Sequence, residues 1–270
     1  MARKKLIVGN WKMNPRSLDE ARKIFSTIKR KVAKLSNVTT VICPPFPYLF
    51  ALKPDNRKIF LGAQDIHSEQ DGAFTGEVSL AMVANAGGRF ILIGHSERRA
   101  LGETDEMINA KLLRALKHGM TAILCVGEKE RDEDGQYLHF INLELLAALE
   151  KIPRTLLKHL VVAYEPIWAI GKSEEEAMQP GDMHEMTIYV RKILKTLYRG
   201  VDVETIPILY GGSVGESNAG TMLREGMADG LLVGRQSLDP QAFGIILALA
   251  DKTRLDSRLD SARLAARQAH

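Results

Sequence analysis

The chain alternates eight times between a short apolar run and a longer stretch of helical periodicity. The apolar runs are KKLIVGN (4–10), VTTVIC (38–43), KIFLGA (58–63), FILIGH (90–95), TAILCVGE (121–128), LVVAYE (160–165), IPILYG (206–211) and DGLLVG (229–234). Helical spacing is clearest over 18–35, 105–119, 139–152 and 184–198. Because the apolar residues of each run are consecutive rather than alternate, they indicate parallel strands covered by helices. Eight such units in 270 residues favour a closed (β/α)8 barrel.

An open, doubly wound sheet would give the same apolar pattern, so the number of units and the total length favour the barrel. The GxGxxG opening of dinucleotide-binding sheets is absent, and no Pro/Gly/Ser-rich linker divides the chain. We therefore predict one α/β domain, a (β/α)8 TIM barrel over residues 1–250. The charged extension over 251–270 could be an added helix, a contact surface or a frayed end.

The charge of the chain argues against a nucleic-acid partner. The formal net charge is +4, and the extension contributes +2 of it through five Lys or Arg and three Asp. No stripe of basic and aromatic residues occurs in the rest of the chain.

The cysteines and the N-terminus indicate a cytoplasmic protein. Cys43 and Cys125 each end an apolar run, which is typical of buried strand-end residues rather than of a disulfide or a zinc pair. The N-terminal MARKK is basic, but the apolar LIV before Gly9 is too short for a signal core or a membrane span. We expect no membrane partner.

Polar residues directly after the strands of a parallel barrel meet at one mouth, where barrel enzymes carry out their chemistry. In this chain they are Asn10, Lys12, Gln64, His95, Glu97, Glu128, Glu165, Ser213, Gly234 and Arg235. Glu165 is the most informative, because a strand covered on both faces tolerates no charge and the carboxylate must lie where the strand emerges.

Glu165 and His95 are candidates for acid–base chemistry. Tyr164 and Pro166 would remove part of the water around Glu165, which raises the basicity of a carboxylate toward what proton removal from carbon requires. Ser96 is predicted to N-cap a helix, so the neighbouring imidazole would lie at the positive end of the helix dipole and favour its neutral form. A neutral imidazole can donate to a carbonyl oxygen and move protons. The residues alone leave two alternatives open. His95 could be a structural histidine that hydrogen-bonds to the backbone, and Glu165 could form an ion pair with a neighbouring Lys or Arg.

Two glycine-bearing turns, YGGSV (210–214) and LVGRQSL (232–238), follow the last two runs, where barrels often bind phosphate through backbone N–H groups. Lys12 would supply a cation for a phosphate or an oxyanion. Tight turns need glycine even where no ligand binds, and most lysines are solvated. The glycine turns and Lys12 therefore also have a purely structural interpretation.

The long connection over 168–182 is typical of a lid over a site. Ser173 and Glu176 within it form a capping-box pattern, which favours a helix start over a ligand site. We expect no metal and no organic cofactor, since the chain has no cluster of metal-ligating residues.

Seven motifs occur in one order over nearly the whole chain. They are GNWKMN (9–14), GAFTGEVS (72–79), GHSERR (94–99), CVGE (125–128), AYEPIWAIG (163–171), YGGSV (210–214) and DGLLVG (229–234). Together they resemble the triosephosphate isomerase family. The resemblance implies an isomerase that interconverts dihydroxyacetone phosphate and D-glyceraldehyde 3-phosphate, through an enediol(ate), in glycolysis and gluconeogenesis.

The same resemblance assigns roles to single residues. Glu165 would remove and return the carbon proton, and His95 would move protons between the two oxygens. Lys12 and Asn10 would stabilise the phosphate and the oxyanion, with Glu97 ordering them. The phosphate would also bind backbone N–H groups of Gly171, Ser213, Gly234 and Arg235.

A loop over about 65–79 is longer than most connections, and the resemblance implies that it enters a pocket of a second subunit. Thr75 matches the threonine of that loop, so we expect a homodimer. A solvent-facing loop is the alternative.

Three places depart from the family's pattern. Residues 172–176 replace the usual TGKTA hinge of the lid, which puts the rate of closure in question. Arg235 and Gln236 replace Gly-Ala at the phosphate turn, where N–H donation survives if φ is negative. Asp65 stands where Asn is frequent.

Two other functions are open at this point. An aldolase would need a desolvated lysine in the barrel for a Schiff base, whereas the runs carry lysine only at their beginnings, at Lys4, Lys5 and Lys58. The second alternative is a barrel that has lost its activity and binds a partner. Only the altered hinge of the predicted lid favours it. Activity on a four-carbon sugar phosphate also stays possible.

Overall fold

Eight parallel strands close into a barrel in the computed structural model, which describes residues 4–54, 57–172 and 177–253. The strands are β1 (Lys5–Asn10), β2 (Val38–Cys43), β3 (Ile59–Ala63), β4 (Gly88–Ile93), β5 (Thr121–Val126), β6 (Leu160–Tyr164), β7 (Ile208–Tyr210) and β8 (Gly230–Val233). Every strand lies within one of the eight apolar runs, except that β4 begins before its run, at Gly88. The predicted barrel is confirmed.

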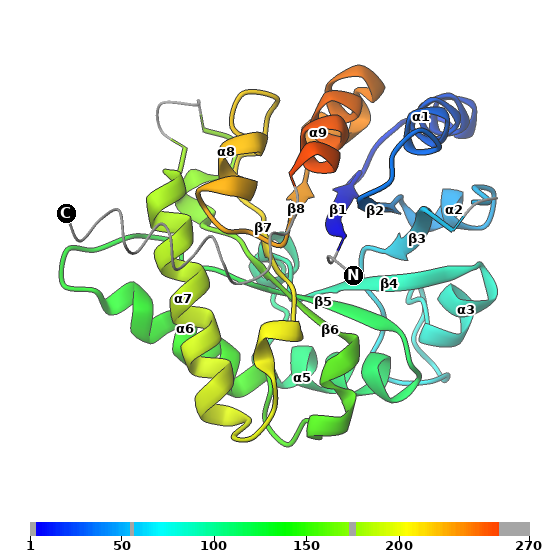
Figure 1. Ribbon diagram of the computed structural model, residues 1–270. Coiled ribbons are helices and arrows are strands. Elements are labelled where there is room, and N and C mark those ends of the chain that lie inside the picture. Colours follow the sequence, from blue (N-terminus) through cyan, green and yellow to red (C-terminus); the bar gives the residue numbers. More distant parts are fainter. Residues whose placement is uncertain (1–3, 55–56, 173–176, 254–270) are drawn as a thin grey trace.

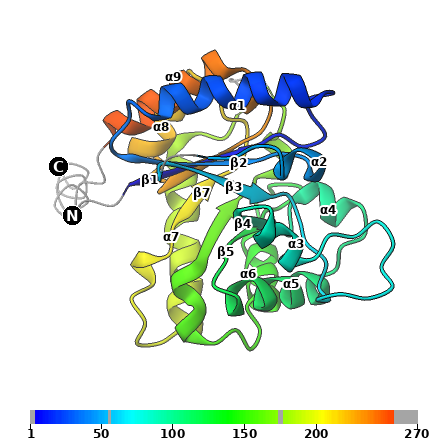
Figure 2. The same ribbon diagram turned by 90° about the vertical axis from the view of Figure 1, so that its right-hand side faces the viewer.

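Helices cover the outside of the barrel (Figure 1). They are α1 (Leu18–Val32), α2 (Phe46–Leu49), α3 (Leu80–Asn85), α4 (Ser96–Ala100), α5 (Asp105–Lys117), α6 (Gln136–Ala148), α7 (Pro180–Leu197), α8 (Ala219–Arg224) and α9 (Pro240–Lys252). Short 3-10 turns lie at Arg154–His159, Ile167–Ala169, Val203–Thr205 and Arg235–Leu238. In Figure 2, the first helix, α1, lies beside the last, α9.

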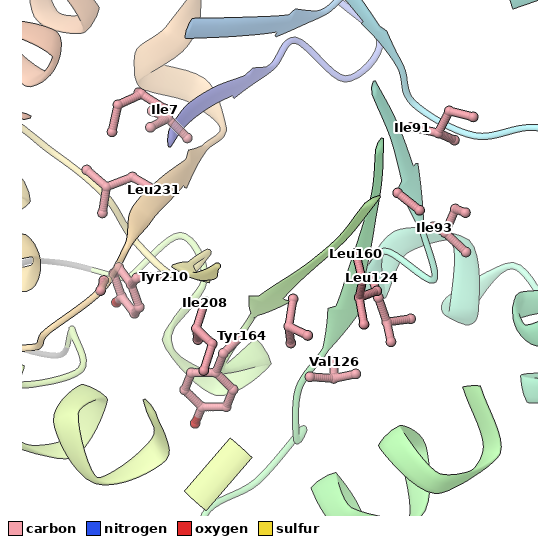
Figure 3. Packing of buried hydrophobic residues seen from close by; sticks show 14 of the residues in the cluster. Ile7, Ile91, Ile93, Leu124, Val126, Leu160, Tyr164, Ile208, Tyr210 and Leu231 are labelled. Atoms are coloured by element: carbon pink, nitrogen blue, oxygen red, sulfur yellow. The ribbon is translucent and has the colours of Figure 1, made fainter. Parts of the chain in front are cut away.

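Consecutive apolar residues are needed because both faces of each strand are buried. Leu6 and Val8 of β1 pack inside the barrel with residues of the other strands, among them Cys43 and Cys125. Ile7, between them, points to the helices, as do Leu124 and the other side chains of Figure 3. Both cysteines are buried free thiols, as the sequence predicted.

The predicted extension begins inside a helix, because α9 runs to Lys252. The carboxylate of Asp251 accepts the backbone N–H groups of Ser36 and Asn37, which joins the end of this helix to the segment before β2. Residues 254–270 lie outside the described residues, so the domain boundary stays a prediction. Among the residues that the structure describes, no helix is long and apolar enough to cross a membrane.

The barrel closes where β8 pairs with β1, and Gly230 makes this approach possible. Leu6 pairs with Gly230, and a Cβ atom added there would lie 1.8 Å from the carbonyl oxygen of Leu6. No side chain can be accommodated without moving one of the two strands.

We expect Gly230→Ala to lower the free energy of unfolding by about 1 to 3 kcal/mol, because the methyl group overpacks a backbone contact. Gly181→Ala is the control, since nothing lies within 4 Å of its added Cβ and alanine favours its helix by up to about 1 kcal/mol. Urea unfolding of both variants measures the difference. Equal stability of the two variants would contradict this account of closure.

Candidate active site

Glu165 directly follows β6 and meets His95, which follows β4, at the carboxyl ends of the strands. Glu165 Oε1 lies 3.6 Å from His95 Nε2. The two residues are buried, with exposed fractions of 2% and 7%. The other carboxylate oxygen, Oε2, accepts the backbone N–H of Ser96 at 3.3 Å. Oε1 has no hydrogen-bond donor among the described residues.

The histidine itself caps the helix that follows it, which corrects the prediction that Ser96 is the N-cap. The N-cap of α4 is His95, whose Nδ1 accepts the N–H of Glu97 at 3.2 Å. A nitrogen that accepts this bond cannot carry a proton, so the neutral ring has its proton on Nε2. The proton therefore points toward the side of the ring where Glu165 lies.

Lys12 is held at the mouth by its backbone as well as by its charge. Its φ is 52°, an unusual conformation for a residue other than glycine. Asn10 Oδ1 accepts its N–H at 3.0 Å, and Gln64 Nε2 donates to its carbonyl at 2.8 Å. The ammonium contacts Glu97 Oε1 at 2.5 Å. The sequence identified Lys12 and Gln64 as mouth residues but gave no sign of this hydrogen bond between them.

The two glycine turns lie next to these side chains. A Cβ added to Gly234 would lie 3.6 Å from Lys12 Cε, so the turn after β8 adjoins the lysine. Arg235 opens a 3-10 turn and does not have a positive φ, which meets the condition set for N–H donation there. Ser213 Oγ donates to the carbonyl of Lys172 at 3.1 Å, and this links the turn after β7 to Gly171 and the start of the predicted lid. Residues 173–176 of the hinge lie outside the described residues.

Glu128 holds the start of the connection after β6, where the sequence predicts a lid, through contacts that the sequence did not predict. Its Oε1 accepts both Tyr164 Oη and Trp168 Nε1 at 2.8 Å. Its backbone carbonyl accepts the N–H of Ile167. Burial raises the pKa of this carboxyl, while the two side-chain hydrogen bonds act in the opposite direction. The strand after which Glu128 lies was evident from the sequence, but its partners come from the end of the next strand, at Tyr164, and from the connection after it, at Trp168.

Glu144 is a second residue that sequence patterns missed. It lies on α6 among helical apolar residues, where a carboxylate would be interpreted as solvated, yet it is 4% exposed. Its Oε2 accepts the N–H of Gly127 and its Oε1 lies 3.3 Å from Arg99. A Cβ on Gly127 would overlap the backbone of Glu165, so Glu144 holds the segment against which the candidate base packs.

Thr75 does not join this site within the chain. It is exposed on the long loop between β3 and α3, whose His67 and Phe74 rings stack at 4.1 Å. Large apolar side chains are also exposed at Met13, Phe74, Met82 and Leu101. In the part of the chain that the structure covers, no group of three or more His, Cys, Asp or Glu residues could hold a metal ion.

Glu144 should make stability depend on pH. Burial raises its pKa from 4.5 to about 7. A carboxyl whose folded pKa is raised stabilises the fold below pH 4.5, and that stabilisation is lost as the pH rises through 7. Because Gln stays neutral, Glu144→Gln should gain stability relative to wild type across this window, by up to about 3 kcal/mol.

Urea unfolding at fixed protein concentration and several pH values measures this gain. Glu150→Gln, at an exposed position just after the same helix, is the matched control for the lost negative charge. The same pH trend in both variants would assign the effect to net charge and contradict the role of burial.

The comparisons with known proteins agree with this geometry. The family model described as triosephosphate isomerase matches residues 5–250. A triosephosphate isomerase of Symbiobacterium thermophilum is 39% identical over 253 residues, covering 92% of this chain and 98% of the relative. That of Alkaliphilus oremlandii is 42% identical, covering 90% and 99%. That of Carboxydothermus hydrogenoformans is 38% identical, covering 91% and 98%. Fold, motifs and relatives together lead to one conclusion: the chain belongs to the triosephosphate isomerase family.

Proposed function

We propose that this chain interconverts dihydroxyacetone phosphate and D-glyceraldehyde 3-phosphate through an enediol(ate). The observation that carries the proposal is the buried carboxylate of Glu165, which lies 3.6 Å from the imidazole of His95 and has one oxygen that accepts no hydrogen bond from the described residues. Family membership supplies the substrate, which is the one that the relatives' name states. Such a reaction belongs to glycolysis and gluconeogenesis, and we place it in the cytoplasm.

In this proposal Glu165 takes a proton from the carbon next to the carbonyl group, and the electron pair of the broken C–H bond forms the C–C double bond. The carbonyl oxygen gains the negative charge, which the Lys12 ammonium stabilises, and this oxygen takes the Nε2 proton of His95. His95 then takes a proton from the other oxygen. Glu165 returns its proton to the neighbouring carbon, so atoms and charges balance and no external redox agent is needed.

The phosphate group fits the side of the mouth where Lys12 adjoins Gly234. Backbone N–H groups of Gly171, Ser213, Gly234 and Arg235 are the proposed donors, because glycine turns let a phosphate approach the main chain closely. Asn10 and Glu97 would act by positioning Lys12. Asn10 accepts the backbone N–H of the lysine, and Glu97 binds its ammonium group. Closure of the lid would exclude water, from which an enediolate needs protection.

An aldolase mechanism has less support than the isomerase mechanism. It requires a desolvated lysine that is neutral and free to attack a carbonyl group. Lys5 and Lys111 are the buried lysines of the described chain. Lys5 Nζ donates to the carbonyl of Ala228 at 2.7 Å, and Lys111 Nζ contacts the carboxylates of Asp65 and Glu103. Both side-chain nitrogens are thus engaged by oxygen atoms of the chain itself.

Glu165→Gln should lower turnover about a thousandfold with little change in KM, because it removes the base and keeps the shape of the side chain. A coupled assay measures turnover, and NMR of deuterium incorporation into dihydroxyacetone phosphate reports proton abstraction directly. Glu130→Gln, at an exposed loop position, is the control. Near-full activity of Glu165→Gln would refute the assignment of the base.

We propose further that two copies form a homodimer through the loop that carries Thr75. Its support is the exposure of this loop together with the apolar side chains of Met13, Phe74 and Leu101, which water contacts in a single chain.

Thr75→Arg should then raise the dissociation constant of the dimer at least about tenfold, because a buried charge without a partner opposes association. Sedimentation equilibrium measures the constant. Thr196→Arg, at an exposed position of α7, is the control. A wild-type protein that sediments as a monomer, or equal effects of both substitutions, would contradict the proposed interface.

A further inference from the structure

Arg99 of α4 and Glu144 of α6 form an ion pair that the proposed chemistry does not use. Arg99 Nη1 lies 3.3 Å from Glu144 Oε1, and the two side chains are 18% and 5% exposed. Solvent therefore screens this pair much less than it screens ion pairs at the surface. Its two helices follow the neighbouring strands β4 and β5, whose last residues, Ile93 and Val126, are labelled in Figure 3.

The guanidinium of Arg99 holds the peptide group that directly precedes His95. Arg99 Nε donates to the carbonyl oxygen of Gly94 at 3.0 Å. Gly94 has a φ of 74°, a conformation that lets the chain turn from β4 straight into α4. The imidazole follows this turn, so the hydrogen bond from Arg99 fixes the backbone from which the imidazole extends.

The carboxylate of Glu144 holds the peptide group to which Glu165 is bonded. Glu144 Oε2 accepts the N–H of Gly127 at 2.8 Å. The carbonyl at the other side of the same peptide bond, that of Val126, accepts the N–H of Glu165 at 2.8 Å. The two hydrogen bonds polarise this peptide group in the same direction and strengthen each other. The carboxylate of Glu144 thus fixes the backbone of Glu165 through one peptide bond.

We propose that Arg99 and Glu144 are positioning residues for the isomerase reaction. Their ion pair connects the peptide group before His95 to the peptide group that holds Glu165, and so sets the distance between the two reacting side chains. This inference rests on the proposed function. A misplacement of about 1 Å can lower turnover about a hundredfold. Substrate binding should change little, because the proposed phosphate donors lie on other segments of the mouth.

Arg99→Met and Glu144→Gln test the proposal in a steady-state isomerase assay of the full chain. Methionine removes every donor of Arg99. Glutamine has one carbonyl oxygen where the carboxylate uses two, so it cannot serve both Arg99 and Gly127. We expect each variant to lower kcat at least about tenfold and to change KM by less than about twofold. The double variant should lose little more than Arg99→Met alone, because the two residues act as a unit.

Two control variants separate positioning from stability. Arg191→Met removes a guanidinium that is 16% exposed and binds Asp229 at 2.7 Å, directly before β8 and thus at the opposite end of the strands from the mouth. It should lower stability and leave kcat within about twofold of wild type. Asp105→Asn removes the other carboxylate that contacts Arg99 Nη1, at 2.7 Å, and should also leave kcat unchanged.

The assays are run at about pH 8, where Glu144 is ionised because its pKa is about 7. Glu144→Gln gains stability relative to wild type as the pH rises to this value, so unfolding cannot explain a fall in its kcat. If Arg99→Met does not fold, Glu144→Gln and its control Asp105→Asn decide the question.

NMR of the substrate-free chain, labelled with nitrogen-15 at histidine, reports the same positioning without turnover. The signals of His95 are those that disappear in His95→Gln. In wild type they should show a single neutral tautomer with the proton on Nε2, because Nδ1 accepts the N–H of Glu97. We expect Arg99→Met and Glu144→Gln to shift these signals toward a mixture of tautomers, and Arg191→Met to leave them unchanged.

Three kinetic outcomes would overturn the proposal: unchanged kcat in both single variants, multiplied losses in the double variant, or an equal fall of kcat in Arg191→Met. A wild-type chain without isomerase activity would instead refute the proposed function. The His95 signals would then decide about the pair by themselves, and unchanged signals in Arg99→Met and Glu144→Gln would reject it.

Discussion

The pairing of β8 with β1 is the contact on which the rest of the molecule depends. Parallel strands that close into a ring bring all their carboxyl ends to one mouth, and residues from opposite ends of the sequence then become neighbours. Lys12 and Gly234 are an example, since more than two hundred residues separate them in the chain. Gly230 allows this closure because a side chain would occupy the space of the Leu6 carbonyl group.

Backbone groups at the mouth fix the side chains that carry the proposed chemistry. The N–H of Ser96 holds one oxygen of Glu165, and the N–H of Glu97 determines which nitrogen of His95 is protonated. A strand end followed at once by a helix supplies both donors, because the first N–H groups of a helix have no partners within it. The geometry of Glu165 and His95, the proposed acid–base pair, is thus a consequence of how β4 passes into α4.

The sequence predicted the strands well because their signal is local. Each run is apolar on consecutive positions, and a strand buried on both faces needs nothing else to be recognised. The strand-end residues followed from the same pattern, and family motifs supplied their roles. The N-cap was predicted at Ser96 and lies at His95, since a serine beside a helix start is the more usual cap and a ring nitrogen is a rare one.

Glu128 and Glu144 show where sequence reasoning reaches its limit. Each is a carboxylate whose hydrogen-bond partners lie on other elements. The neighbouring sequence does not show whether those partners come within hydrogen-bond distance of it. By itself, the sequence determined the order of the elements and the residues that follow each strand, because hydrophobic periodicity and strand ends are local properties, and the number of units favoured a closed barrel. Only the tertiary structure decided that β8 closes on β1, which carboxylates are buried and which N–H groups hold them, because those depend on distances between segments remote in the chain.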